Sequence, residues 1–483
     1  MTGLFRLAVA GLALTGLVAV AAPSALAADG TVATRRPAEA QARAGTRLWV
    51  ARYRVRGQDP DSQAAAVVTS LGGRMVFVTG SSAGNAALHG SSDDYDLATV
   101  AYAGATGRRR WAARYRGPLG GGTMAAASAI SPDGSTVYVT GQDFQAGGGP
   151  SAYVTVAYDA ATGTRRWAQT FQTATPSGDS PDRATAIAVS PDGSTVYVTG
   201  DDVTSSAGGY SYGTVAYDAA TGAQLWTATY AGASASGIAV SPDGSTVYVT
   251  GSAQVSSPAG SFDFATVAYR AATGAQLWAR LYHGLPGSSS TLATAIAVSP
   301  HGSSVFVTGG TSSASRLGYA TVSYDGATGR TRWARTYEPA GSAGVTTATA
   351  VVLNPAGTSV IVTGKDSSPS ARGAYVTVAY RAASGARLWS RRDASRGFLT
   401  FPAAAISPDG ATAYLAYSDN DTSYAIEALN AATGAERWRR VYGGLAQGVP
   451  DSIAVSRPGP LVFVTGSSLY GSGDQYGTVA YRG

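Results

Sequence analysis

All eight tryptophans of the sequence stand at the end of the same repeated segment. Its best copy runs from Ala216 through Asp218, Thr221 and Gly222 to Trp226. The tryptophans recur on average about every 56 residues, and a period of that size indicates a repeat architecture rather than the three independent domains that the length would allow. The tryptophans are Trp49, Trp111, Trp167, Trp226, Trp278, Trp333, Trp389 and Trp438.

Each repeat predicts four short β-strands separated by turns. In the best-formed copy they cover residues 184–189, 194–200, 212–217 and 224–230. The first turn is Ser190-Pro191-Asp192-Gly193, in which proline presets φ, aspartate can bond its own backbone and glycine accepts a positive φ. The strands alternate with period two, as in Thr136-Val137-Tyr138-Val139, which favours β-structure over helix.

The two ends of the chain complete each other. The eighth repeat stops at Gly483 before its tryptophan strand, whereas residues 44–53 form a tryptophan strand with no repeat before it. This pattern predicts an all-β fold, an eight-bladed β-propeller over residues 42–483, in which the N-terminal strand closes the last sheet.

The N-terminal segment resembles an export signal. Residues 1–27 contain Arg6, an apolar run over 7–20 and the small-residue sequence Ala25-Leu26-Ala27. We therefore expect cleavage before Ala28 and a secreted, extracellular protein, with association with the cell wall as one form of that location. Residues 28–41 show no alternation and predict a disordered leader. The apolar run is too short to span a bilayer comfortably, so no membrane span is expected.

Composition removes several kinds of chemistry. The chain has no cysteine, and therefore no disulfide, thiolate nucleophile or thiolate metal ligand. Its net charge of +6 comes from arginines placed beside the tryptophans rather than in one basic tract, which argues against nucleic-acid binding. His89, His283 and His301 fall in separate predicted loops or turns, so no histidine pair for acid–base catalysis is expected.

The tryptophan segments resemble the docking motif A-x-D-x-x-T-G-x-x-x-W of quinoprotein, or PQQ-like, β-propellers. Two copies match in full, Ala157 to Trp167 and Ala216 to Trp226, and the others are partial, with Ala103 or Arg270, for example, in place of the aspartate. The second strand is similar to the YVTN-type propeller repeat of surface and secreted proteins. The resemblance implies the propeller fold, with the tryptophans as blade-to-blade docking residues.

The resemblance also bears on the cofactor. Quinoprotein dehydrogenases stack PQQ between a tryptophan and a vicinal disulfide, beside Ca²⁺ and a catalytic aspartate. This chain has no cysteine, and each tryptophan belongs to a docking motif. We therefore expect no PQQ.

Aspartates recur at the end of the second strand, on the face where the variable loops emerge. Asp143, Asp202, Asp366 and Asp419 stand two residues after the strand's Val-Thr-Gly end or its counterpart, with Asp201 and Asp421 close by. Such oxygen ligands suit Ca²⁺ or a hydroxyl-rich glycan, and the alternative is that aspartate simply begins a solvated loop.

These observations predict a non-catalytic, monomeric binding or scaffolding module with an extracellular protein or polysaccharide as partner. The alternative is an enzyme, either a degenerate quinoprotein dehydrogenase or a hydrolase or lyase that uses carboxylates of the loop face. No catalytic residue can be singled out from the sequence.

Overall fold

The computed structural model describes most of the chain from residue 43 to residue 483. The described residues are 43–54, 62–83, 95–172, 182–203, 210–255, 261–284, 288–313, 317–338, 346–367, 373–394, 400–420, 423–443, 447–457, 459, 461–470 and 473–483. The predicted signal peptide, residues 1–27, and the predicted leader, residues 28–41, lie outside them.

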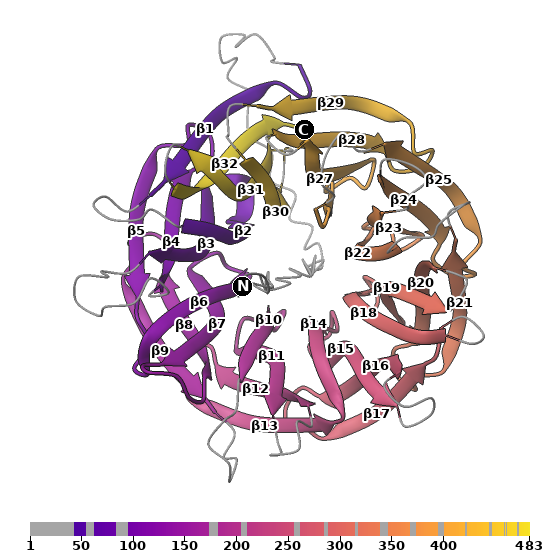
Figure 1. The fold of residues 1–483 in the computed structure, drawn as a ribbon, viewed down its shortest axis with the longest axis horizontal. Helices are drawn as coiled ribbons and strands as arrows, with labels where there is room; N and C mark the ends of the chain where they lie inside the picture. Colours follow the sequence, from indigo (N-terminus) through magenta and orange to yellow (C-terminus); the bar gives the residue numbers. More distant parts are fainter. Residues whose placement is uncertain are drawn as a thin grey trace, which may run out of the picture.

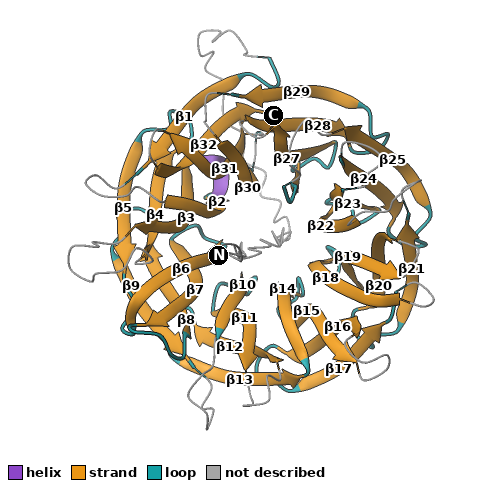
Figure 2. Ribbon diagram, viewed as in Figure 1, coloured by secondary structure: helices purple, strands orange, loops and turns teal. Residues whose placement is uncertain are grey.

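The described residues form 32 strands and one short 3-10 turn, Leu71–Gly73, arranged as a ring of radial sheets (Figures 1 and 2). The strands nearest the axis are β2 (Ser62–Thr69), β6 (Gly120–Ile130), β10 (Arg183–Val189), β14 (Ala233–Val240), β18 (Ser288–Val298), β22 (Thr346–Leu353), β26 (Ala403–Ile406) and β30 (Gln447–Val455). The second strands are β3 (Met75–Ala83), β7 (Thr136–Gln145), β11 (Thr195–Val203), β15 (Thr246–Val255), β19 (Ser304–Ser313), β23 (Ser359–Asp366), β27 (Thr412–Asn420) and β31 (Leu461–Tyr470).

The third strands are β4 (Tyr95–Ala103), β8 (Ala152–Asp159), β12 (Tyr210–Asp218), β16 (Ser261–Arg270), β20 (Leu317–Asp325), β24 (Ala374–Arg381), β28 (Ser423–Asn430) and β32 (Gly473–Arg482). The outer strands are β5 (Arg109–Tyr115), β9 (Arg165–Phe171), β13 (Gln224–Ala231), β17 (Gln276–Tyr282), β21 (Thr331–Tyr337), β25 (Arg387–Ala394), β29 (Glu436–Tyr442) and β1 (Arg47–Tyr53). Blade one is β2–β5 and the numbering follows the chain to blade eight, which is β30–β32 with β1.

The sheet order explains how the ring closes. Blade eight has the order β1-β32-β31-β30, and β1 pairs antiparallel with β32 from Arg47↔Tyr481 to Tyr53↔Tyr476. Blades four and five are joined by one parallel bridge, Phe262↔Ser290, and are otherwise separate four-stranded units. The all-β propeller predicted from the sequence is confirmed, and this order agrees with eight blades closed by the N-terminal strand.

The tryptophan of each outer strand docks on the next blade. The indole Nε1 of Trp226 donates to the carbonyl oxygen of Ala271 at 2.7 Å, and Trp49 of blade eight donates likewise to Gly104 of blade one. The ring lies on the turn glycine: a Cβ on Gly274 would come within 2.6 Å of Trp226, and its φ is +70°. That glycine is therefore required both by the backbone and by the indole.

Seven indoles make this hydrogen bond. The seven pairs are Trp49–Gly104, Trp111–Ala160, Trp167–Ala219, Trp226–Ala271, Trp278–Gly326, Trp333–Ala382 and Trp389–Ala431. Trp438 packs on Tyr481 and on the Gly45 turn, but its indole N–H has no acceptor within the described part of the chain.

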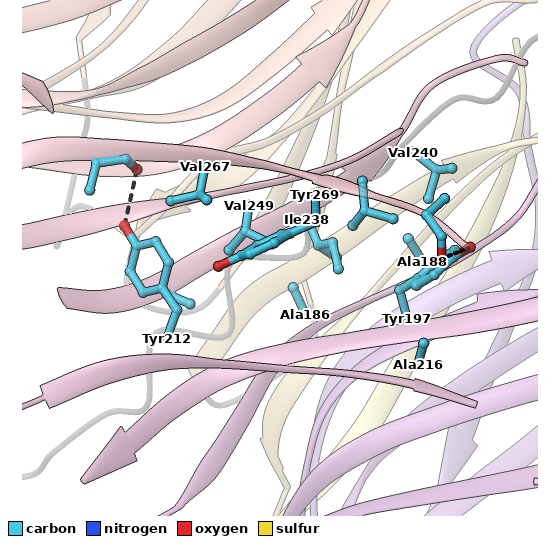
Figure 3. Close-up of a cluster of buried hydrophobic side chains, with 14 of the residues drawn as sticks. Ala186, Ala188, Tyr197, Tyr212, Ala216, Ile238, Val240, Val249, Val267 and Tyr269 are labelled. Carbon is cyan, nitrogen blue, oxygen red and sulfur yellow. Dashed lines mark hydrogen bonds between the residues drawn. The ribbon is translucent and has the colours of Figure 1, made fainter. Parts of the chain in front are cut away.

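Apolar cores lie between neighbouring blades. Figure 3 shows the one between blades three and four, where Ile238, Val249 and Val267 pack with tyrosines. The hydroxyl of Tyr212 donates to Ala265 O at 3.0 Å, and the hydroxyl of Tyr197 donates to Ala271 O at 3.4 Å. These two hydroxyls thus bond across the blade boundary, whereas the buried hydroxyl of Tyr269 in the same core has no hydrogen-bond partner among the described residues.

We predict that Trp226→Ala lowers the free energy of unfolding by roughly 3 to 5 kcal/mol, because it deletes a buried aromatic side chain and its interblade hydrogen bond. Leu225→Ala is the matched control, since Leu225 is 53% exposed and its truncation should change stability by less than about 0.5 kcal/mol. Urea unfolding of the two variants makes the comparison. An unchanged curve for Trp226→Ala would refute the docking role.

Candidate functional site

The four predicted site aspartates are inside strands rather than at the start of solvated loops. Asp143, Asp202, Asp366 and Asp419 are each at most 6% exposed. They are covered because the second strand stays paired with the third beyond its glycine, as in Asp143↔Ala152. The alternative interpretation, a solvated loop, is therefore wrong for these positions.

The carboxylates are bound within their own blades. Arg392 contacts Asp366 at 3.1 Å, and Arg439 forms an ion pair with Asp419. Asp143 accepts a hydrogen bond from the backbone N–H of Leu119, and burial raises the pKa of its carboxyl. These contacts explain why the aspartates are tolerated in the interior.

The remaining candidate aspartates and histidines do not lie together in one site in the described part of the chain. Asp201 pairs with Arg183 at 2.8 Å, His283 pairs with Asp263, and His301 lies in a short turn. Asp421 and His89 lie outside the described residues. Across the described ranges, no group of three or more histidine, aspartate or glutamate side chains is placed to hold a metal ion.

Blade seven departs most from the repeat. Tyr417 stands where the other second strands have glycine, such as Gly200, whose added Cβ would lie 2.0 Å from the oxygen of Arg183 on the first strand. In blade seven the first strand is only four residues long and its pairing ends at Ala403↔Ala416. A large side chain is therefore accommodated at Tyr417.

Beside Tyr417 lies a fully buried glutamate. Glu427 replaces the valine that the other third strands carry, and its side chain is 0% exposed. The hydroxyl of Tyr417 donates to Oε2 of Glu427 at 3.1 Å, and Arg391 of blade six lies 2.7 Å from Oε1. Burial, reinforced by the charge of Asp393 and opposed by Arg391, raises the pKa of Glu427 to about 7.

Arg391 is diverted from the role of its counterparts. Two residues after the tryptophan in blade five, Arg335 donates to the turn carbonyls of Gly385 and Ser384 in the next blade, at 3.0 and 2.9 Å. Arg391 instead binds a set of acidic residues, Glu427, Asp393 and Glu436. Sequence reasoning missed this network, although comparing Glu427 with the valines of the other copies would have shown it.

A second unusual carboxyl lies on an inner strand. In several blades a hydroxyl at the bulge of the first strand bonds to the next blade, as Thr294 does to Ala348 O at 2.7 Å. Blade eight has Asp451 at this bulge, where it accepts hydrogen bonds from the backbone N–H and hydroxyl of Ser467. The residue keeps partial exposure, yet the inner strands packed around its carboxyl raise its pKa to about 7.

A positively charged groove lies on the outer surface where blade eight meets blade one, a boundary called here the closing seam. Its volume is about 490 Å³. Its lining residues are Tyr53, Arg54, Arg109, Arg110, Trp111, Ala112 and Arg114. Arg114 pairs with Asp96 at 2.7 Å, whereas Arg54, Arg109 and Arg110 have no acidic partner in the described part of the chain.

The fold and these repeats define a β-propeller with PQQ-like repeats. The family model described as outer membrane protein assembly factor BamB matches residues 263–482, and the predicted resemblance to PQQ-like propellers is confirmed. No curated protein matches the chain. In the described residues, no helix is both long and apolar enough to cross a membrane.

Solved structures agree on the fold at low identity. The quinohemoprotein alcohol dehydrogenase of Comamonas testosteroni superimposes with a TM-score of 0.56 at 15% identity, covering 90% of this chain and 76% of that one. The quinohemoprotein alcohol dehydrogenase ADHIIG of Pseudomonas putida HK5 gives 0.53 at 12%, with the same coverages. The Dos1 propeller gives 0.54 at 10%, covering 91% of this chain and 95% of that one.

The residues present do not fit PQQ. In the quinoproteins that the sequence resembles, a tryptophan ring forms one side of the cofactor site. Here each tryptophan ring lies against a turn glycine of the next blade, as Trp167 lies against Gly222, where an added Cβ would come within 2.7 Å of the indole. Each indole is therefore engaged in docking one blade on the next.

We predict that stability falls as pH rises from about 4 to about 7, because Glu427 and Asp451, whose pKa values are raised in the folded state, lose stabilising protons over that range. For Glu427 the window runs from its ordinary 4.5 to about 7. Glu427→Gln should remove part of the fall, because a neutral amide can still contact Tyr417 and Arg391. Melting temperatures across pH test this, with the unsubstituted chain as the reference. A Gln variant whose melting temperature keeps the full pH dependence would rule out the assignment.

Proposed function

We propose that this chain is a secreted, non-catalytic propeller that acts as an extracellular binding or scaffolding module for a protein or a polysaccharide. The observation that carries the proposal is the arginine-lined groove at the closing seam. The groove lies on the outer surface of the ring and contains arginines that have no acidic partner in the described residues. Two aromatic side chains, Tyr53 and Trp111, lie beside them. Arginine and aromatic side chains are the residues most enriched at sites of macromolecular recognition.

The internal chemistry supports a scaffold. The tryptophans lock neighbouring blades, and the buried Asp366 and Asp419 are paired with arginines of their own blades. These contacts stabilise a rigid ring, and rigid rings present loops and rims for binding at little ordering cost. Export rests on residues 1–27, with cleavage before Ala28 proposed from the sequence.

An enzyme is the alternative. One observation favours it: Glu427 has a pKa near neutrality, which suits a general acid or base. Its carboxyl is, however, fully buried and already engaged by Tyr417 and Arg391. The groove, by contrast, is open to a partner.

A thermal-shift panel tests the proposal. The purified chain is heated with acidic peptides, cell-wall polymers and simple glycans, with Ca²⁺ alone, and with PQQ plus Ca²⁺. We expect a polymer or peptide to raise the melting temperature, and PQQ plus Ca²⁺ to leave it unmoved with no dye-reducing activity. A PQQ-dependent shift accompanied by dye reduction would overturn the non-catalytic proposal. If Ca²⁺ alone leaves the melting temperature unmoved, the calcium hypothesis fails.

A further inference from the structure

Arg110 lacks the carboxylate partner that two of its three arginine counterparts possess; the third, Arg437, has Asn430 in place of the aspartate. In blade two, Arg166 precedes the tryptophan and pairs with the motif aspartate Asp159 at 2.8 Å, and blade five repeats this pair. Blade one has Arg110 in the same place, but Ala103 occupies the position of the aspartate. A guanidinium that is neutralised elsewhere in the ring therefore lines the groove without its carboxylate.

The groove also lacks the arginine that stands two residues after the tryptophan in blades four to seven, and blades one and three likewise have alanine at this position. Between blades seven and eight, Arg440 reaches across and donates to Gly45 O at 3.0 Å. At the closing seam the same position, two residues after the tryptophan, is Ala51. A short side chain there leaves the space between Tyr53 and β5 open.

The strand that carries these arginines has a free edge. β5 is the last strand in the order β2-β3-β4-β5, so its outer edge has no partner strand within the described residues. Arg110, Ala112 and Arg114 alternate along it as exposed residues. Arg110 and Arg114 are four residues apart, so their Cα atoms lie about 13 Å apart along the strand.

We propose that this groove binds an acidic peptide segment in extended conformation, which pairs with the free edge of β5 and sets its carboxylates against Arg110 and Arg109. The inference rests on the proposed binding role and names the partner's chemistry. Backbone pairing with a strand edge requires a peptide, and acidic side chains complement the charge of the exposed arginines. The guanidinium fork binds carboxylates in two-point geometry.

Fluorescence anisotropy with a labelled peptide of alternating glutamate and threonine tests the proposal, with the matched glutamine–threonine peptide as the neutral control. We expect the acidic peptide to bind, and added salt to weaken binding because exposed charges are screened. Arg110→Ala should weaken it about tenfold through loss of a charge-assisted contact. Arg166→Ala removes the same charge from a paired position in blade two and should leave binding unchanged.

The substitution Ala103→Asp is the sharpest variant. It restores the motif aspartate, so it should capture Arg110 as Asp159 captures Arg166, and weaken peptide binding without removing any arginine. Circular dichroism melting of each variant confirms folding. Unchanged binding by Ala103→Asp, equal losses in Arg110→Ala and Arg166→Ala, or no binding at all would overturn the groove assignment.

Two further measurements distinguish a failure of the proposed peptide partner from a failure of the proposed binding function. A single-stranded oligonucleotide or a sulfated polysaccharide that binds through Arg110 more tightly than the peptide would overturn the peptide as partner. A second outcome is that no peptide binds, while a polymer from the thermal-shift panel binds equally well to the unsubstituted chain and to Arg110→Ala. That outcome would refute the groove inference and leave the proposed binding function intact. A PQQ-dependent activity would remove the proposed function itself.

Discussion

The structure depends on one contact repeated around the ring, an indole laid on the turn of the next blade. Each sheet is only four strands wide and cannot bury both faces alone, so stability comes from the boundaries between sheets. The tryptophan supplies a large apolar face and, in seven blades, a directed hydrogen bond to a turn carbonyl. The same turns need glycine twice over, because φ is positive and the indole leaves no room for a Cβ.

The closing seam follows from this arrangement. β1 comes from the N-terminal part of the sequence, but its backbone hydrogen bonds make it the outer strand of blade eight. Trp49 on β1 then docks this blade on blade one. At the closing seam, Ala51 stands where blades four to seven have an arginine, and Ala103 stands where three blades have the motif aspartate. The groove arises from these substitutions at one boundary, whereas the network around Glu427 arises from the shortened first strand of blade seven.

Much of the fold could be predicted from the sequence, because the repeats carry it redundantly. The period of the tryptophans, the turn at Ser190 and the unmatched strand around Trp49 each pointed to the same ring. The candidate site was harder. Asp366 was expected at the start of a loop. Its burial depends on how far β24 remains paired with β23, and this length cannot be predicted from the sequence of one strand alone. The replacement of aspartate by Ala103 was visible, but its consequence for Arg110 appears only once Arg166 and Asp159 are seen in contact.

The most direct test of the docking account is hydrogen exchange at the indole N–H groups, followed by NMR on chain labelled with ¹⁵N at tryptophan. The account predicts that seven of the eight indoles, Trp49 among them, exchange slowly, and that Trp438 exchanges faster than the others. If Trp49 exchanged as fast as free tryptophan while the other six remained protected, β1 would not be docked on blade one, and closure of the ring by the N-terminal strand would be contradicted.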